Sequence, residues 1–256
     1  NMNDLKLRNF TIGNSQPLTL MGGMNVLESR DLVLQVAEKF KSISDKLEIN
    51  YIFKGSFDKA NRSSASSFRG PGMDEGLKLL QEVSTEFNVP VVTDIHEPDQ
   101  AKPVSEICEV VQIPAFLARQ TDLVVAAAKT NAILQFKKPQ FLSAPEMKNI
   151  IEKCETAGNS KITLCERGNS FGYNNLVVDT LNFQILKNLG KPAIFDVTHS
   201  LQLPGGLGNA AGGRREYLLS LAKAGISIYT ANILKFFPIR WSGFKPRNCF
   251  PTPKRC

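Results

Sequence analysis

Short apolar runs alternate along this chain with longer segments whose apolar residues recur every three or four positions. Residues 31–47 are a clear helical case, because Val33, Val36 and Phe40 fall on one side of a helix. Further helices are predicted at residues 73–87, 99–107, 120–130, 145–157, 176–189 and 212–224. Strands are predicted at residues 18–23, 51–53, 90–96, 110–113, 132–137, 161–167, 192–199 and 226–232.

Eight short strands that alternate with helices are typical of a (β/α)8 TIM barrel. We therefore expect one α/β domain that spans residues 1–256. An open, doubly wound sheet is the alternative, since periodicity alone does not separate the two. Residues 5–12 alternate apolar and polar side chains, and with a turn at Gly13-Asn14-Ser15 they predict an N-terminal hairpin within residues 1–15.

Polar residues stand at the carboxyl ends of seven of the eight predicted strands. A strand buried on both faces is normally apolar, so such residues call for a reason. In a barrel these ends meet at one mouth, where active sites are built. Taken singly, Gln112 and Asp196 are also explained as hydrogen-bonded core groups. The whole set is Asn25, Lys54, Asp94, His96, Gln112, Lys137, Arg167, Asp196 and His199.

The loop at residues 54–64 follows a predicted strand and carries three cations, an asparagine and three serines. Lysine supplies point charge, arginine a planar fork of donors, and serine and asparagine further donors. This set suits a multiply charged anion such as a phosphate ester. Read alone, the loop is explained equally well as a solvated, charged turn. With Lys137 and Arg167 it predicts a cation-rich mouth for a small anionic substrate.

The net charge of +7 belongs to the end of the chain. Residues 235–256 hold six Lys and Arg and no acid, and the remaining 25 basic and 24 acidic residues leave only +1. The charge therefore does not favour nucleic-acid binding. No apolar run reaches the roughly 18 residues that a membrane helix needs, and no signal peptide is expected. Five scattered cysteines without a C-x-x-C pair indicate reduced thiols and a cytosolic location.

Both histidines, His96 and His199, fall at strand ends. This placement favours chemistry or metal ligation over a structural role. Asp94 could add a ligand, but no cysteine stands at a strand end. A metal is therefore possible but not indicated by these residues.

Several long motifs run in order over about residues 15–225. The motifs are Gly22–Asp31, Lys54–Ser64, Arg69–Gly72, Thr93–Pro98, Gln112–Asp122, Lys137–Phe141, Phe195–His199 and Gly212–Arg215. They are very specific, and they resemble the 3-deoxy-D-manno-octulosonate 8-phosphate synthase family.

The resemblance implies a cytosolic barrel transferase without a cofactor. Members condense phosphoenolpyruvate with D-arabinose 5-phosphate and release inorganic phosphate, and the product enters lipopolysaccharide synthesis. Members form homotetramers, and neither nucleic acid nor membrane is an implied partner.

The resemblance also implies roles for residues at matching positions. Asn61, Arg62 and Ser63 would hold the sugar phosphate, and Arg119 would reach a neighbouring subunit's site. Asp94 would line the cavity, and Lys59 would give a proton to the aldehyde oxygen. The residues expected around phosphoenolpyruvate are Lys54, Lys59, Gln112, Lys137, Arg167 and His199. The expected catalytic set is Lys59, His199, Asn25 and Asp94.

The family has metal-dependent and metal-independent branches, and the former carries cysteine where this chain has Asn25. Asparagine is a poor ligand for a soft divalent metal, so the resemblance implies the metal-independent branch.

From about Ile228 the chain departs from the family pattern. It lacks the Glu-x-His-Pro and Lys-Cys-Asp-Gly-Pro segments and ends in a stretch rich in proline, arginine and phenylalanine. We expect residues 228–256 to form an atypical eighth unit. A reading-frame shift or altered gene end explains this, and a divergent cap is the alternative. A related aldol synthase for another sugar phosphate, or a non-catalytic phosphosugar-binding barrel, are the competing functions.

Overall fold

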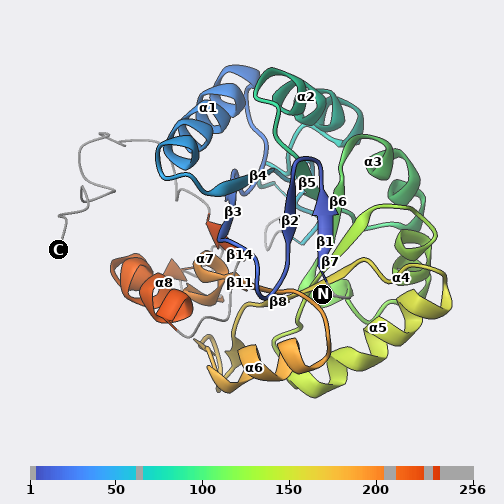
Figure 1. Ribbon diagram of the computed structural model, residues 1–256, viewed down its shortest axis with the longest axis vertical. Helices are drawn as coiled ribbons and strands as arrows, with labels where there is room; N and C mark the ends of the chain where they lie inside the picture. The colour runs from blue at the N-terminus through green and yellow to red at the C-terminus, as the bar shows by residue number, and fades with distance from the viewer. Residues whose placement is uncertain (1–3, 62–65, 205–211, 228–232, 237–256) are drawn as a thin grey trace.

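The computed structural model describes residues 4–61, 66–204, 212–227 and 233–236. Eight strands close into a parallel barrel in the spatial order β11-β14-β3-β4-β5-β6-β7-β8 (Figure 1). The closed ring confirms the predicted barrel and excludes the open doubly wound sheet. The strands are β3 (Thr19–Gly23), β4 (Asn50–Lys54), β5 (Val91–Asp94), β6 (Val110–Ile113), β7 (Ile133–Lys137), β8 (Ile162–Glu166), β11 (Ala193–Asp196) and β14 (Ile233–Phe236).

Helices lie on the outside of the barrel between successive strands (Figure 1). They are α1 (Arg30–Lys46), α2 (Met73–Glu86), α3 (Ala101–Ile107), α4 (Thr121–Ala128), α5 (Met147–Thr156), α6 (Leu181–Asn188) and α8 (Leu218–Ser227). Short 3-10 turns, η1 (Pro98–Gln100) and η3 (Ala144–Glu146), lead into α3 and α5. None of the helices described is long and apolar enough to cross a membrane.

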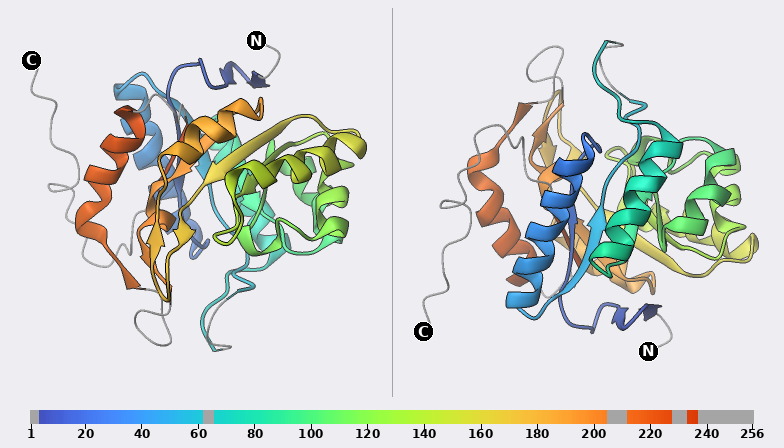
Figure 2. Two further views of the ribbon diagram at one scale, coloured as in Figure 1. Left: turned by 90° about the horizontal axis from the view of Figure 1, so that it is seen from below. Right: turned by 90° about the horizontal axis from the view of Figure 1, so that it is seen from above.

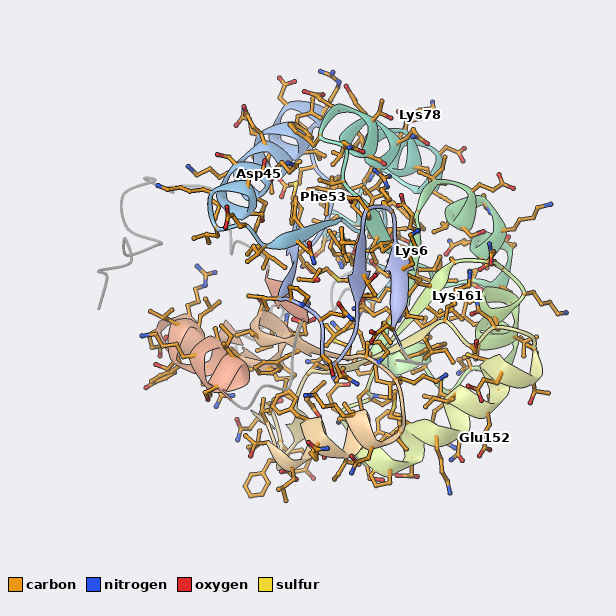
Figure 3. All side chains as sticks on the ribbon, in the orientation of Figure 1. Lys6, Asp45, Phe53, Lys78, Glu152 and Lys161 are labelled. Atoms are coloured by element: carbon orange, nitrogen blue, oxygen red, sulfur yellow. The ribbon has the colours of Figure 1, made fainter. Side chains whose placement is uncertain are left out.

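Helix α1 shows how local sequence sets these elements. Ser29 caps its amino end by accepting a hydrogen bond from the Leu32 amide at 3.4 Å. Val33 and Val36 are buried against the barrel, as the apolar spacing predicted. Charged side chains such as Lys78 on α2 and Glu152 on α5 lie at the outer rim (Figure 3).

The barrel interior has an apolar floor. One buried side chain from each of seven strands joins it, together with Leu7 and Ile12 of the N-terminal hairpin, β1 (Leu5–Leu7) and β2 (Phe10–Ile12). The hairpin therefore plugs the amino-terminal end of the barrel. Figure 2 shows it at one end of the molecule and the loop after β4 at the other. The strand residues of the floor are Met21, Ile52, Val92, Val110, Ile133, Cys165 and Ile194.

A polar layer stands above this floor. Side chains two positions apart on a strand share a face, so the residue two beyond each floor residue also faces the interior. These positions hold Gly23, Lys54, Asp94, Gln112, Gln135, Arg167 and Asp196, and Lys137 lies one step further along β7. The apolar floor and polar layer explain why the strands begin apolar and end polar.

Two predicted boundaries near the N-terminus and β8 were wrong. The hairpin turns at Arg8, which has a positive φ of 54°, and not at residues 13–15. Residues 176–177 form β10 (Leu176–Val177), which pairs with β9 (Asn169–Ser170), so the predicted helix 176–189 is shorter. The helix starts later because the Asp179 carboxylate accepts the Leu181 amide at 2.9 Å.

The boundaries in the last third also differ. Strand β11 stops at Asp196, whose carboxylate accepts the His199 amide and starts the short helix α7 (Val197–Ser200). Residues 212–213 form β13 (Gly212–Gly213), which pairs with β12 (Gln202–Leu203), so the predicted helix 212–224 is also displaced.

The predicted strand 226–232 was wrong at its start, because α8 continues through Ser227. Gly225 is buried on this helix, where an added Cβ would lie 2.5 Å from a Phe195 ring carbon. Close helix–strand packing therefore outweighs the strand preference of the β-branched Ile226. The eighth barrel strand is β14, which pairs in parallel with β11 and β3.

Candidate active site at the barrel mouth

A first polar cluster joins the ends of β4 and β5. Lys54 and Asp94 form a buried ion pair, and Ser56 donates a hydrogen bond to the same carboxylate oxygen. The Ser56 hydroxyl accepts from Lys54 Nζ at 2.9 Å and from Lys59 Nζ at 2.7 Å. A hydroxyl offers one donor and two acceptor sites, so Ser56 uses all three. It therefore fixes two ammonium groups relative to one carboxylate.

His96 completes this cluster. Its Nε2 lies 3.1 Å from the second oxygen of Asp94, and its ring edge packs against Phe57. The amide of His96 donates to Gln100 Oε1 at 2.8 Å, which ties the loop after β5 to η1. This histidine holds Asp94 in place from the side opposite Lys54.

A second cluster joins the ends of β7, β8 and β11. Lys137 Nζ lies 3.0 Å from Asp196 Oδ2, and His199 Nδ1 lies 2.9 Å from the same oxygen. Arg167 Nη2 donates to the His199 carbonyl oxygen at 3.2 Å. Since Asp196 accepts from Nδ1, the His199 ring is held in one orientation with Nε2 on the far edge.

Gln112 links the two clusters around the barrel. It lies beside Asp94 in the register of β5 and β6 and accepts from Gln135 Nε2 at 3.3 Å. Gln135 in turn precedes Lys137 by two positions on the same interior face of β7. Interior polar positions therefore run without a break over neighbouring strands from β4 through β8 to β11.

The mouth is electropositive although its charges are buried. Its four cations in the two clusters outnumber the two carboxylates. Burial works against the charged form of Asp94, yet Lys54 and Lys59, with His96, hold the pKa of its carboxyl well below the ordinary value. Burial lowers the pKa of the Arg167 guanidinium, and Asp196 opposes that shift. Such a site attracts a substrate with more negative charge than the two carboxylates neutralise.

Five other predicted site residues are not members of the two clusters described above. Asn25 is half-buried just beyond β3, and Asn61 is exposed in the loop after β4. Arg62 and Ser63 lie outside the described residues. The side chain of Arg119 is exposed. Hydrogen bonds from Ser143 lower the pKa of the Glu146 carboxyl on η3, and the charge of Arg119 adds a smaller part of that shift.

Sequence reasoning missed two groups of the site, Ser56 and Gln135, and left the role of Asp196 open. Ser56 was counted only as one serine of the loop, and Gln135 was hidden in an apolar strand. Asp196, read alone as a core group, proves to be the shared partner of Lys137 and His199. The period-two pattern of the strands would have found Gln135, because it lies on the face of Lys137.

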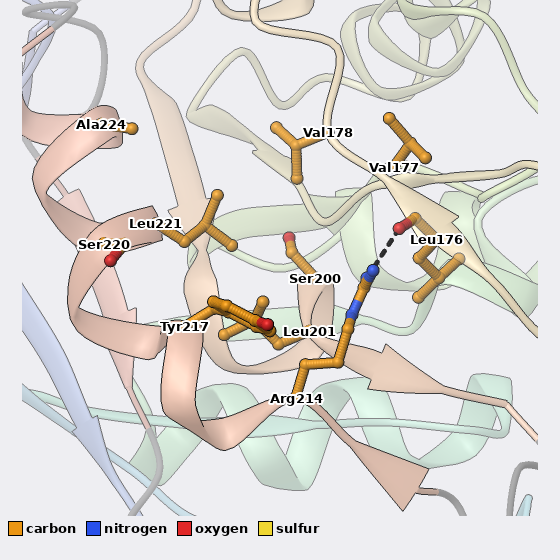
Figure 4. A pocket seen from close by; sticks show the side chains of 10 residues that line it. All are labelled: Leu176, Val177, Val178, Ser200, Leu201, Arg214, Tyr217, Ser220, Leu221 and Ala224. Atoms are coloured by element: carbon orange, nitrogen blue, oxygen red, sulfur yellow. Dashed lines mark hydrogen bonds between the residues drawn. The ribbon is translucent and has the colours of Figure 1, made fainter.

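No group of three or more His, Cys, Asp and Glu side chains gathers to hold a metal ion within the described residues. A separate hollow of about 430 Å³ lies between β10, α7 and α8. Arg214 crosses it and donates to the Leu176 carbonyl oxygen at 2.8 Å (Figure 4). It is lined mainly by apolar side chains and includes no predicted site residue, so the polar barrel mouth is the better candidate.

The fold and the mouth together define a barrel enzyme with an electropositive candidate site at the carboxyl ends of its strands. The chain belongs to the DAHP synthetase I family, whose model matches residues 3–234. A 2-dehydro-3-deoxyphosphooctonate aldolase from Hahella chejuensis is 58% identical over 229 residues, which cover 90% of this chain and 82% of the relative. Relatives of the same name from Pseudomonas paraeruginosa and Pseudomonas aeruginosa are 59% identical over 223 residues, covering 87% of this chain and 79% of each relative.

Replacing Asp94 by asparagine leaves Lys54 buried without its counter-ion. We expect Asp94→Asn to lower the free energy of unfolding by about 3–5 kcal/mol at neutral pH. Because the folded pKa of Asp94 is depressed, its stabilisation is complete above the unfolded value of about 3.9 and is lost as pH falls through the folded value. The difference from wild type should therefore shrink below about pH 4.

Urea unfolding at a series of pH values measures this difference. The surface variant Asp45→Asn is the control, since Asp45 pairs only with Lys41 at the surface in the contacts described. It should change stability by about 0.5 kcal/mol or less. A loss in Asp94→Asn that stays constant down to acid pH would contradict the assigned ion pair.

Proposed function

We propose that this enzyme condenses phosphoenolpyruvate with D-arabinose 5-phosphate to give 3-deoxy-D-manno-octulosonate 8-phosphate and inorganic phosphate. The observation that carries the proposal is the polar layer at the barrel mouth, in which the cations of the two clusters outnumber the carboxylates. One substrate bears a phosphate and a carboxylate and the other a phosphate, so their charges complement that layer. The relatives named above support the choice of reaction.

The cations orient both substrates for carbon–carbon bond formation. Lys54, Lys137 and Arg167 bind the phosphate and carboxylate of phosphoenolpyruvate, with Gln112 beside them. Asn61, Arg62 and Ser63 bind the phosphate of the sugar, and Asn25 lines the cavity. This arrangement turns C3 of phosphoenolpyruvate toward the aldehyde carbon, which lowers the entropic cost of the encounter.

The chemical step needs a proton donor and an activated water. C3 attacks the aldehyde carbon, and the aldehyde oxygen takes a proton from Lys59. Water then adds to C2, and phosphate leaves with cleavage of its bond to C2. Asp196 orients His199 so that Nε2 can accept the proton of that water. Asp94 holds Lys54 and, through Ser56, Lys59 in register with the substrates.

Phosphate release tests the reaction directly. We expect release from phosphoenolpyruvate that depends on D-arabinose 5-phosphate, with little release when erythrose 4-phosphate replaces it or when no sugar is present. Release with erythrose 4-phosphate would indicate the related aldol synthase. Binding of both substrates without release would indicate a non-catalytic phosphosugar barrel.

Lys59 is the proposed proton donor to the aldehyde oxygen. We expect Lys59→Ala to lower kcat by about 100-fold or more, in the range of general acid catalysis. Binding of phosphoenolpyruvate should weaken much less, and titration calorimetry measures it. The exposed Lys78→Ala, on α2, is the matched control and should leave both constants unchanged. Weakened binding with an unchanged kcat would contradict the role of Lys59.

The catalysis is metal-independent in this proposal. This part of the proposal rests on Asn25, because an amide at this position is a poor ligand for a soft divalent ion. Activity should survive dialysis against EDTA, and added Mn²⁺ or Zn²⁺ should not raise it. Loss of activity in EDTA that a divalent ion restores would place the enzyme in the metal-dependent branch.

We further propose a homotetramer in the cytoplasm, built from one barrel domain per chain. The exposed side chain of Arg119 suits a role in a neighbouring subunit's site. Cys108 and Cys154 are buried free thiols in the described part of the chain, which suits a reducing compartment. Residues 228–256 are proposed to be an atypical eighth unit, since their composition departs sharply from the rest.

A further inference from the structure

A third buried charged pair lies directly behind the mouth, on the outer face of the barrel wall. Glu166 is the last residue of β8, and Lys138 follows the last residue of β7. Both are 0% exposed, and Lys138 Nζ lies 3.7 Å from Glu166 Oε1. The interior positions of these strands belong to Cys165, Arg167 and Lys137, so the pair points away from the substrates.

Glu166 shapes the turn from which Arg167 projects. Its Oε1 accepts the Arg167 amide at 2.8 Å and the Gly168 amide at 2.6 Å. Gly168 has a φ of +88°, a conformation that favours glycine, so the chain turns sharply here. The Arg167 side chain then enters the barrel and donates to the His199 carbonyl oxygen. The Glu166 carboxylate therefore fixes the backbone from which the Arg167 side chain projects.

Lys138 supports the same turn from β7. Its ammonium donates to Asn169 Oδ1 and to the Leu142 carbonyl oxygen at 3.4 Å. Its amide donates to the Cys165 carbonyl oxygen at 2.8 Å, which holds β7 and β8 together at the level of Lys137. Burial lowers the pKa of Lys138, and the charge of Glu166 opposes that shift.

A buried ion pair does not by itself make a fold more stable than apolar side chains of similar size. Two such charges placed one residue from Lys137 and one residue from Arg167 therefore suggest a role in the site. We propose that Glu166 is a positioning residue, which holds the Arg167 guanidinium in place for the anionic substrate, and that Lys138 is its buried counter-ion. The inference rests on the proposed function for the identity of that substrate.

Two double variants test whether the turn depends on the hydrogen bonds to Glu166 or on the two charges. Lys138→Met with Glu166→Gln, called the Gln pair, removes both charges and keeps an oxygen that can accept hydrogen bonds from the two amides. Lys138→Met with Glu166→Leu, called the Leu pair, removes the acceptor as well. We expect the Leu pair to raise KM for phosphoenolpyruvate by about tenfold or more, with KM for arabinose 5-phosphate nearly unchanged. The Gln pair should stay within about threefold of wild type in both constants.

Glu166→Asp is a further probe that keeps the charge balanced. Its carboxylate is drawn back by one methylene from the two amides, so KM for phosphoenolpyruvate should again rise selectively. The control is Lys191→Met with Glu155→Leu, which removes an ion pair remote from the polar layer. It should leave both KM values unchanged, which separates positioning from general loss of an ion pair.

A further experiment tests whether the effect of the Leu pair on KM passes through the Arg167 side chain. In an Arg167→Ala background, the Leu pair should add less than about threefold to KM, because its effect passes through the guanidinium. Equal effects with and without Arg167, or equal KM values in the Leu and Gln pairs, would overturn the proposal.

Amide exchange of ligand-free protein gives a readout that does not depend on the proposed reaction. The Gly168 amide should be protected in wild type and the Gln pair and should exchange faster in the Leu pair. Unchanged protection in the Leu pair would overturn the proposal even in an active enzyme. An inactive wild type with the expected exchange pattern would instead refute the proposed function alone.

Discussion

The sharing of Asp94 and Asp196 among several cations is the interaction on which this structure depends. Each carboxylate lies at the end of a barrel strand, and each holds a lysine and a histidine in contact. Without the carboxylates, the buried ammonium groups would lose charge or move toward solvent. Because two carboxylates serve more cations than they neutralise, the mouth remains positive and suits an anion. Stability and binding are thus coupled through the same two side chains.

Much of the fold followed from local patterns. The apolar spacing of α1, the runs of β4 to β7 and the polar strand ends predicted the barrel and the end at which its site lies. The hairpin turn at Arg8 was missed because the glycine at residue 13 gave a stronger turn signal. Strand β14 was misplaced because Ile226 favours a strand locally, while the packing of Gly225 on Phe195 keeps it in a helix. Such long-range contacts leave no mark in a short window of sequence.

The candidate site was predicted by residue type more than by contact. Lys54, Asp94, Lys137 and Arg167 all lie in the polar layer, as their strand-end positions indicated, and His199 contacts that layer from α7 through Asp196. Which carboxylate pairs with which cation depended on which strands lie side by side: β4 lies beside β5, and β8 alone separates β7 from β11. The role of Ser56 as a three-way hydrogen-bond partner was equally invisible, because it depends on the positions of three other side chains.

A structure with phosphoenolpyruvate bound tests the central claim most directly. The account predicts that the phosphate and carboxylate oxygens of one molecule lie within hydrogen-bond distance of cations from both clusters, Lys54 or Lys59 on one side and Lys137 or Arg167 on the other. A molecule bound beside Arg214 on the outer face, or held by one cluster with the other untouched, would contradict it.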